Sequence, residues 1–155
     1  MPQDGIEKQD CESRAARRWL GAHGVKYKAL KPVYLGDDLF SRQAICEAVH
    51  FLFVCKPDSH PPIEDFLTGI VPETQSIQGR IGKKRMTYRY RWLNDMPLRG
   101  DEKSMTVNWF GIEIVDAKDT VTYRNSFISD PPVHRDNVAA MAAAGRARWK
   151  ACPRT

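Results

Sequence analysis

Apolar side chains recur at helical spacing near the start of the chain. They occupy one face of residues 7–20 in a helical projection, and two glycines, Gly21 and Gly24, follow directly. Because glycine is a poor helix former, we expect a short amphipathic helix that ends at these glycines.

Two compact apolar runs follow, each typical of a buried strand. Residues 33–35 come after a proline and end at Gly36, and residues 50–57 end at a second proline. Between them, Ser41 can cap a helix that continues to about residue 49. Strand, helix and strand in this order predict a unit with parallel strands.

From about residue 73 the pattern changes to alternation of apolar and polar residues. This alternation is typical of half-buried strands, and the segment contains three clear ones: residues 85–93, 105–115 and 120–128. A short helix opened by proline, residues 61–67, comes before it. After it, Asp136 can cap an Ala-rich helix over residues 138–150.

These elements predict an α/β fold with an inserted antiparallel β segment, α+β overall. At 155 residues the chain is about one domain long. We therefore expect a single domain with an α/β part at residues 1–72, a β-rich insertion at 73–130, and a C-terminal helix and tail at 131–155.

The composition is that of a globular protein in water, with 42% hydrophobic and 28% charged residues. No apolar run approaches the roughly 18 residues of a membrane span, and the N-terminal segment lacks the apolar core of a secretory signal. The four cysteines show no CxxC spacing, which favours free buried thiols over disulfides or a zinc site. We expect a cytoplasmic protein.

The net charge is +5, and much positive charge gathers in one segment. In an extended strand, the aromatic side chains of this segment lie on one face, and Arg89 and Arg91 lie on the other. One face can then pack while the other meets phosphates. A basic edge strand that its charge keeps from aggregating is the other interpretation. Residues 79–93 contain no acid and six basic residues: Arg80, Lys83, Lys84, Arg85, Arg89 and Arg91.

Two adjacent aspartates, Asp37 and Asp38, follow the first predicted strand. Carboxylates side by side repel each other, and the carboxyl ends of parallel strands are where ligand sites lie. The pair can hold Mg²⁺, which prefers oxygen ligands, although two aspartates alone are too few to fix an octahedral ion. The alternative is structural: Asp38 caps the following helix and Asp37 closes a turn.

Two blocks of the sequence resemble a known enzyme family. They are VYLGDDLF at residues 33–40 and GRARWK at residues 145–150, with further similar stretches such as FLFVCKPDSHP and YRYRWLNDMPLR between them. Together they resemble the bacterial DDE-type insertion-sequence transposases over residues 2–150. The resemblance implies a partial ribonuclease-H-like catalytic domain that carries a β-strand insertion.

In that family, two aspartates and a glutamate hold two Mg²⁺ or Mn²⁺ ions, which activate water or a 3′-hydroxyl for attack on a DNA phosphodiester. The resemblance places the second aspartate on Asp37, as catalytic and metal-binding residue, with Asp38 as the alternative. It aligns Arg148 with an arginine of the family's late helix and places Cys152 where the glutamate is expected. The first aspartate belongs to a strand upstream of Met1, so we expect an incomplete triad.

The resemblance therefore implies a truncated transposase fragment, from a family that carries out DNA transposition by mobile elements. Its implied partners are DNA, as transposon ends and target, and a full-length transposase in a mixed oligomer. Arg148 joins the basic strand as a candidate DNA contact. We do not expect strand transfer by this chain alone. Two alternatives stay open: a DNA-binding remnant or regulator without catalysis, and a non-functional product.

Overall fold

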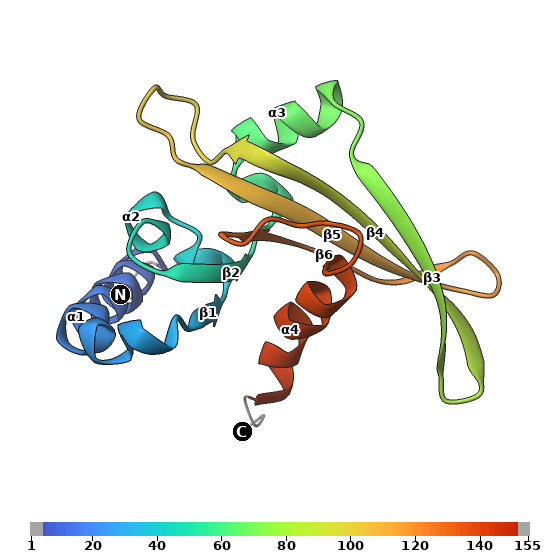
Figure 1. Cartoon of the computed structure of the whole chain (residues 1–155). Helices are drawn as coiled ribbons and strands as arrows, with labels where there is room; N and C mark the ends of the chain where they lie inside the picture. Colours follow the sequence, from blue (N-terminus) through green and yellow to red (C-terminus); the bar gives the residue numbers. More distant parts are fainter. Residues whose placement is uncertain (1–4, 152–155) are drawn as a thin grey trace.

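The computed structural model describes the backbone of residues 5–151 and the side chains of residues 14–38 and 40–147. Within that part, the chain forms one six-stranded mixed sheet and four α-helices (Figure 1). The helices are α1 (Gly5–Tyr27), α2 (Gln43–Cys46), α3 (Pro61–Gly69) and α4 (Val138–Ala151). The strands are β1 (Val33–Gly36), β2 (His50–Val54), β3 (Glu73–Ile81), β4 (Lys84–Pro97), β5 (Thr106–Asp116) and β6 (Val121–Ser129).

The strands lie in the order β1-β2-β6-β5-β4-β3. The pair β1 and β2 is parallel, with Tyr34 opposite Phe51. The other neighbouring strands of the described sheet are antiparallel. The predicted strand–helix–strand unit with parallel strands is therefore confirmed, and so is the antiparallel segment that follows it.

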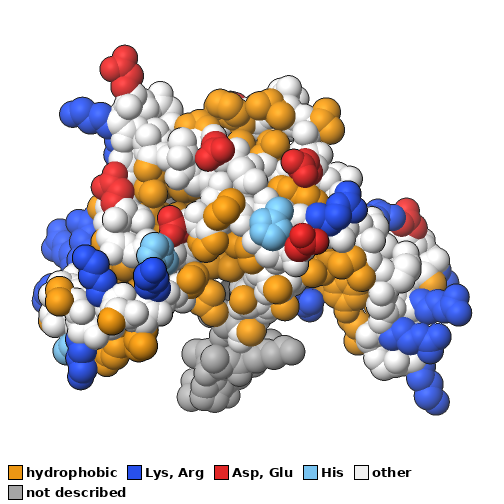
Figure 2. Space-filling view, in the orientation of Figure 1, with side chains coloured by type: hydrophobic (Ala, Val, Ile, Leu, Met, Phe, Trp, Pro, Cys, Tyr) orange, Lys and Arg blue, Asp and Glu red, His pale blue; other side chains and the backbone are white. Residues whose placement is uncertain are grey.

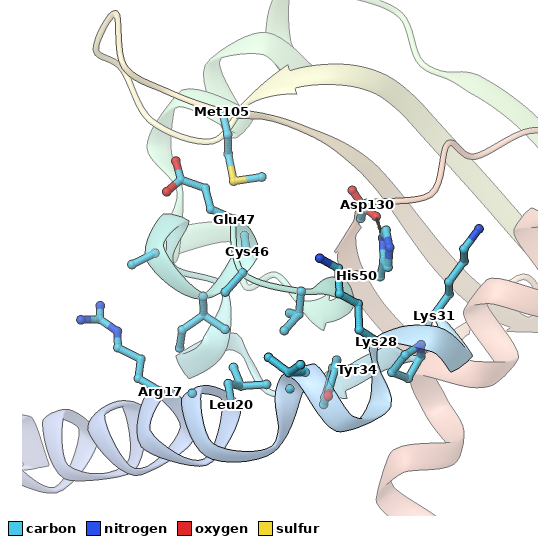
Figure 3. A pocket seen from close by; sticks show the side chains of 18 residues that line it. Arg17, Leu20, Lys28, Lys31, Tyr34, Cys46, Glu47, His50, Met105 and Asp130 are labelled. Carbon is cyan, nitrogen blue, oxygen red and sulfur yellow. Dashed lines mark hydrogen bonds and ion pairs between the residues drawn. The ribbon is translucent and has the colours of Figure 1, made fainter.

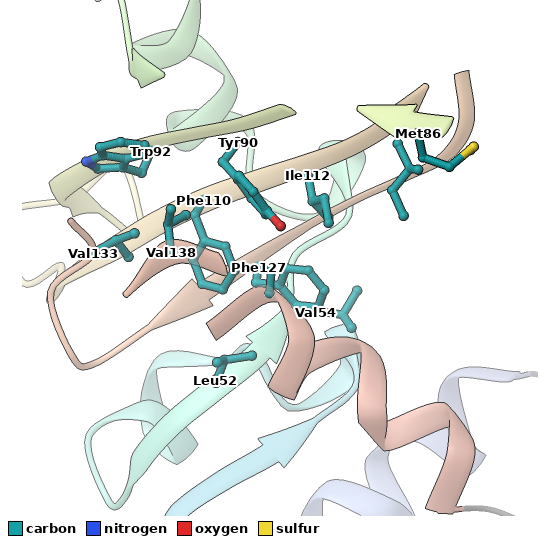
Figure 4. Packing of buried hydrophobic residues seen from close by; sticks show 12 residues of the cluster. Leu52, Val54, Met86, Tyr90, Trp92, Phe110, Ile112, Phe127, Val133 and Val138 are labelled. Carbon is teal, nitrogen blue, oxygen red and sulfur yellow. The ribbon is translucent and has the colours of Figure 1, made fainter. Parts of the chain in front are cut away.

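The long strands β3 to β6 form a twisted ribbon, and α4 lies against one face of it (Figure 1). On this face β4 buries Tyr90 and Trp92, as the alternation of its sequence predicts. Phe110 and Phe127 stack beside them with ring centroids 5.1 Å apart (Figure 4). Each fully buried side chain of this kind stabilises the fold by roughly 1.5–3 kcal/mol.

A second core lies on the opposite face of the sheet, where α2 and α3 pack. It includes Phe51 and Phe53 of β2, Ile63 of α3, and Trp109 and Ile128 of the long strands. Strand β2 is therefore buried on both faces, which explains why its sequence is a continuous apolar run.

The prediction that the first helix ends at Gly21 and Gly24 is wrong, because α1 continues to Tyr27. Nothing lies within 4 Å of the position that a Cβ atom would take on either glycine. A glycine inside a helix is only about 1 kcal/mol less favourable than an alanine, so a helix can continue through it. A short 3-10 turn, Lys28–Leu30, follows α1, and the helical path ends at Lys31. Lys31 has a left-handed φ of 46°, and Pro32 comes next in the chain.

The expectation of a buried first strand is also wrong. Strand β1 is an edge strand, and Val33 is 45% and Leu35 43% exposed. Only Gly36, at its end, is buried. An edge strand of four residues has a neighbour on one side alone, so its apolar side chains are only partly covered.

The helix predicted over residues 41–49 is a single turn, α2, and Arg42 rather than Ser41 lies at its N-cap. Ser41 is fully buried, and its Oγ lies 2.8 Å from Nε2 of His60. The hydroxyl is thus engaged across the fold instead of capping the helix.

The last helix begins at Val138, as predicted. The residue directly before it is Asn137, whose side chain accepts a hydrogen bond from the His134 amide and donates one to the Pro132 carbonyl. The turn that leads into α4 is therefore organised by Asn137, whereas a cap at Asp136 was the expectation.

Candidate nucleic-acid interface

A strongly basic surface lies at the tip of the β3–β4 hairpin. Figure 2 shows lysine and arginine side chains gathered over this end of the molecule. The strands join through a tight turn in which Ile81 pairs with Lys84, and Gly82 adopts the left-handed φ of 62° that such a turn uses. The turn brings four exposed cations together: Arg80, Lys83, Lys84 and Arg85.

Arg80 lies directly opposite Arg85 across the hairpin. The Cβ atoms of directly opposed residues are about 4.5–5.5 Å apart, so two like charges in these positions destabilise the strand pair. An anion bound between the two guanidinium groups would remove that repulsion, and phosphate fits their paired N–H donors. The hairpin tip is therefore suited to bind phosphate.

Arg89 and Arg91 lie on the face of β4 opposite its buried aromatic side chains, as predicted. Arg89 forms an ion pair with Asp119, in the turn between β5 and β6. The guanidinium of Arg91 lies 5.6 Å from the ring centroid of Trp109, which is a cation–π distance. Arg89 is thus already neutralised within the chain, whereas Arg91 keeps its charge available to a ligand.

These two arginines line a groove of about 490 Å³ on the open sheet face beside α3. Lys56 and Glu64 contribute to its rim. Across the sheet, Arg124 forms an ion pair with Glu113 at 2.9 Å. The groove therefore carries charges of both signs, of which Arg89, Glu113 and Arg124 are in ion pairs, and it is less cationic than the hairpin tip.

An unpaired donor lies at the floor of this groove. Trp109 is buried, and its indole nitrogen has no hydrogen-bond partner within the described part of the chain. The ring lies over Gly111, where a Cβ atom would come within 3.1 Å of the ring carbon Cη2. The glycine therefore leaves room for the indole beside Arg91.

Asp37 and Asp38 lie at the carboxyl end of β1, as predicted. Asp37 is the N-cap of the 3-10 turn Asp38–Phe40, and its Oδ1 accepts a hydrogen bond from the Asp38 amide at 2.9 Å. Asp38 accepts hydrogen bonds from the Lys56 amide and from the Ser59 hydroxyl. Asp38 thus joins the carboxyl ends of the two parallel strands, and the residue that caps the following turn is Asp37, not Asp38 as the structural alternative expected.

The donor set at this strand end is small for a metal site. Among the described side chains, no three His, Cys, Asp or Glu residues come together to hold a metal ion. Both oxygens of Asp38 already accept hydrogen bonds within the chain. Asp37 stays a predicted ligand of Mg²⁺ or Mn²⁺, and Asp38 is the poorer candidate because its carboxylate maintains the loop.

The buried pair of Ser41 and His60 has no signal in the sequence, because 19 residues separate its members. Burial lowers the pKa of His60 below its ordinary value of 6.5. Ser41 is fully buried, and its Oγ also donates a hydrogen bond to the Asp38 carbonyl. A substrate has no access to this hydroxyl, so the pair is a structural link between the strand-end loops.

A larger hollow of about 680 Å³ lies between α1 and the α2–β2 segment (Figure 3). Arg17, Lys28 and Lys31 line it, and an ion pair between His50 and Asp130 lies at one side. Its lining also includes a buried thiol, Cys46, whose pKa burial raises to about 12. That thiol is protonated at neutral pH and is a poor nucleophile.

Two further sequence predictions fall outside these surfaces. The side chain of Arg148 lies outside the described residues, as does Cys152. In the described chain, no helix is long and apolar enough to cross a membrane. Comparison of the sequence with protein-family models and with curated proteins gives no match.

Proposed function

We propose that this chain is a DNA-binding protein of the DDE transposase type, and that it contacts the DNA backbone through the tip of the β3–β4 hairpin. The resemblance of VYLGDDLF and GRARWK to that family supports the family assignment. The proposal also includes a partial ribonuclease-H-like fold. Two features are consistent with that fold. The pair β1–β2 is parallel and has Asp37 at its carboxyl end, and the antiparallel strands β3–β6 follow it in the chain.

The observation that carries DNA binding is the pairing of Arg80 with Arg85 at an exposed tip. A folded protein tolerates such repulsion at a cost, and a phosphate backbone offsets it. Lys83 and Lys84 extend the positive surface at the turn. Such contacts position a protein on DNA and give an affinity that depends on salt and little on sequence.

The test is the salt dependence of binding to labelled duplex DNA, measured by fluorescence anisotropy. The double variant Arg80→Ala/Arg85→Ala should weaken binding at every salt concentration. Each phosphate contact contributes about 0.9 to the slope of log affinity against log salt, so the slope should become shallower by about 2.

The matched control is Arg14→Ala/Arg18→Ala, which removes the same charge from exposed positions on α1. It should leave the slope close to that of the unchanged chain. Equal losses in both double variants would mean that net charge alone attracts DNA, and an unchanged slope in the hairpin variant would refute the proposed contact.

The same proposal allows two outcomes: the chain binds DNA without cleaving it, or it also carries out strand transfer. With Mg²⁺ or Mn²⁺ and terminal-repeat DNA, joined products that disappear in Asp37→Asn would extend the proposal to catalysis. Salt-dependent binding without products would instead favour a regulator that occupies transposon ends or pairs with a full-length transposase.

A further inference from the structure

Strand β3 is a long sheet edge with little of the usual protection. All nine of its residues pair in continuous register with β4, without a bulge. Its sequence, ETQSIQGRI, contains neither proline nor lysine, and its two charged residues, Glu73 and Arg80, lie at or next to its ends. Natural edge strands are normally shortened, bent by bulges or blocked by such residues, because their outward backbone groups can pair with another chain. The outer edge of β3 is therefore open to strand addition.

The two faces of β3 follow from its register with β4. Glu73, Ile77 and the other odd-numbered residues lie on the α4 face, because their partners include the buried Trp92. The even-numbered residues, from Thr74 to Arg80, lie on the groove face, opposite the arginines of β4. In antiparallel pairing, directly opposed residues share a face. If β3 pairs with another copy of itself and the two sheets continue each other, an odd-numbered residue must therefore lie opposite an odd-numbered residue.

We propose that β3 pairs antiparallel with β3 of a second copy of this chain. The twofold axis that relates the copies passes between their two Ile77 residues. In this register Ile77 meets Ile77, and Gln75 meets Gly79 of the second copy. The pairing covers Ile77 and Ile81, which are 37% and 50% exposed in the single chain. A twofold interface must be self-complementary, and a strand that is centred on an isoleucine meets that condition.

Charge favours this orientation. Residues 57–79 contain four acids and no lysine or arginine, whereas residues 80–91 contain six cations and no acid. Antiparallel pairing places the basic hairpin tip of each copy beside the acidic start of β3 in the other. Arg80 comes opposite Thr74 of the second copy, on the face where Glu64 and Thr74 line the groove. The attraction should speed association in this orientation and disfavour a parallel one.

An unpaired acceptor lies in the middle of the same edge. Oε1 of Gln75 is buried and has no hydrogen-bond partner within the described residues. Its opposite residue in the pairing, Gly79, has no side chain, and the Tyr88 ring fills that space, 2.7 Å from where a Cβ atom would lie. The pairing therefore brings a phenol ring of the second copy beside the unpaired oxygen.

The test is the molar mass in solution without DNA, measured by sedimentation equilibrium over a range of protein concentrations. The unchanged chain should be a dimer. Ile77→Lys places two lysines against each other at the axis and should raise the dissociation constant roughly tenfold or more. Val33→Lys is the matched control, because Val33 is a similarly exposed residue on the opposite edge of the sheet. It should leave the dimer intact.

Two further experiments fix the register and guard against misfolding. At a concentration where the unchanged chain has just become a dimer, Ile77→Lys and Ile77→Glu should each be mainly monomeric, with unchanged circular dichroism, and should form a mixed dimer when combined. Ile77→Cys should form a disulfide-linked dimer on mild oxidation, and Val33→Cys should not. The pairing does not rest on DNA binding, so failure of either proposal leaves the other intact.

A monomer at all concentrations would overturn the proposal. So would a dissociation constant that Ile77→Lys leaves unchanged, or lysine and glutamate variants that do not combine, because both results place the interface elsewhere. Added salt should weaken the dimer, and a dimer that salt strengthens would refute the charge argument.

Discussion

A Cβ atom on Gly145 would lie 2.6 Å from Cε1 of Phe127, closer than such atoms approach in proteins. The backbone of α4 therefore rests directly on the aromatic core of the sheet. Leu52 of β2 lies on the same spot, 3.0 Å from the same position. The glycine of the block GRARWK thus has a packing role at this position.

Gly145→Ala should destabilise the protein. The added methyl group overpacks a filled core, which costs about 1–3 kcal/mol and exceeds the helix propensity gained from alanine. Urea unfolding measures the loss. Gly21→Ala is the control, because nothing lies within 4 Å of its Cβ position in α1, and it should stabilise the protein by up to about 1 kcal/mol. Equal effects at both glycines would contradict the close packing of α4.

Asp38→Ala should also destabilise the fold, because the Lys56 amide and the Ser59 hydroxyl lose their acceptor. Hydrogen bonds to a charged group contribute about 1.5–3 kcal/mol each when well formed, and partial exposure lowers this toward about 1–3 kcal/mol in total. Ser59→Ala removes one of the two bonds and should cost less. If Ser59→Ala destabilises the protein as much as Asp38→Ala does, the hydrogen bond from the Lys56 amide to Asp38 contributes little to stability. Denaturant unfolding of both variants measures the difference.

The strands β4, β5 and β6 could be predicted from sequence because each has one buried face. Tyr90 and Trp92 alternate with Arg89 and Arg91, and this period of two survives in the structure. Strand β3 was not separated from its surroundings, since Ile77 and Ile81 are its only apolar residues. Pairing with β4, rather than burial of its own side chains, makes it a strand.

Long-range contacts explain most of what the sequence did not predict. The strand predicted over residues 85–93 continues to Pro97 through an irregularity at Asp95, whose φ is 57°. The bonds of Asp38 and the Ser41–His60 contact join residues that lie about twenty positions apart. Local patterns carry no trace of such pairs, so the loop contacts of Asp38 could not be predicted from the sequence.

The thiols of Cys46 and Cys55 should resist alkylation in the folded protein. Burial raises the pKa of Cys46 to about 12 and that of Cys55 above its ordinary range, so neither forms thiolate at neutral pH. Iodoacetamide followed by mass spectrometry should find both unmodified at pH 8 and both modified in urea. Rapid labelling of either thiol in the native protein would mean that the second core opens readily. The labelling result therefore distinguishes inert buried thiols, which the cysteine spacing predicts, from reactive thiols.

Stability should fall as the pH drops below 6.5, and His60 should cause much of the fall. Burial lowers its pKa in the folded state, so the unfolded chain binds a proton at a higher pH than the folded chain does. Stability is then fully present above pH 6.5 and is lost as the pH falls through that value toward the lower pKa of the folded state. His60→Gln should flatten the pH dependence of unfolding between pH 7 and 5, while it lowers stability at pH 7 through loss of the Ser41 contact. His134→Gln, at an exposed position, is the control and should keep the slope of the unchanged chain. If both variants keep that slope, another group is responsible, and the buried Ser41–His60 pair does not respond to pH.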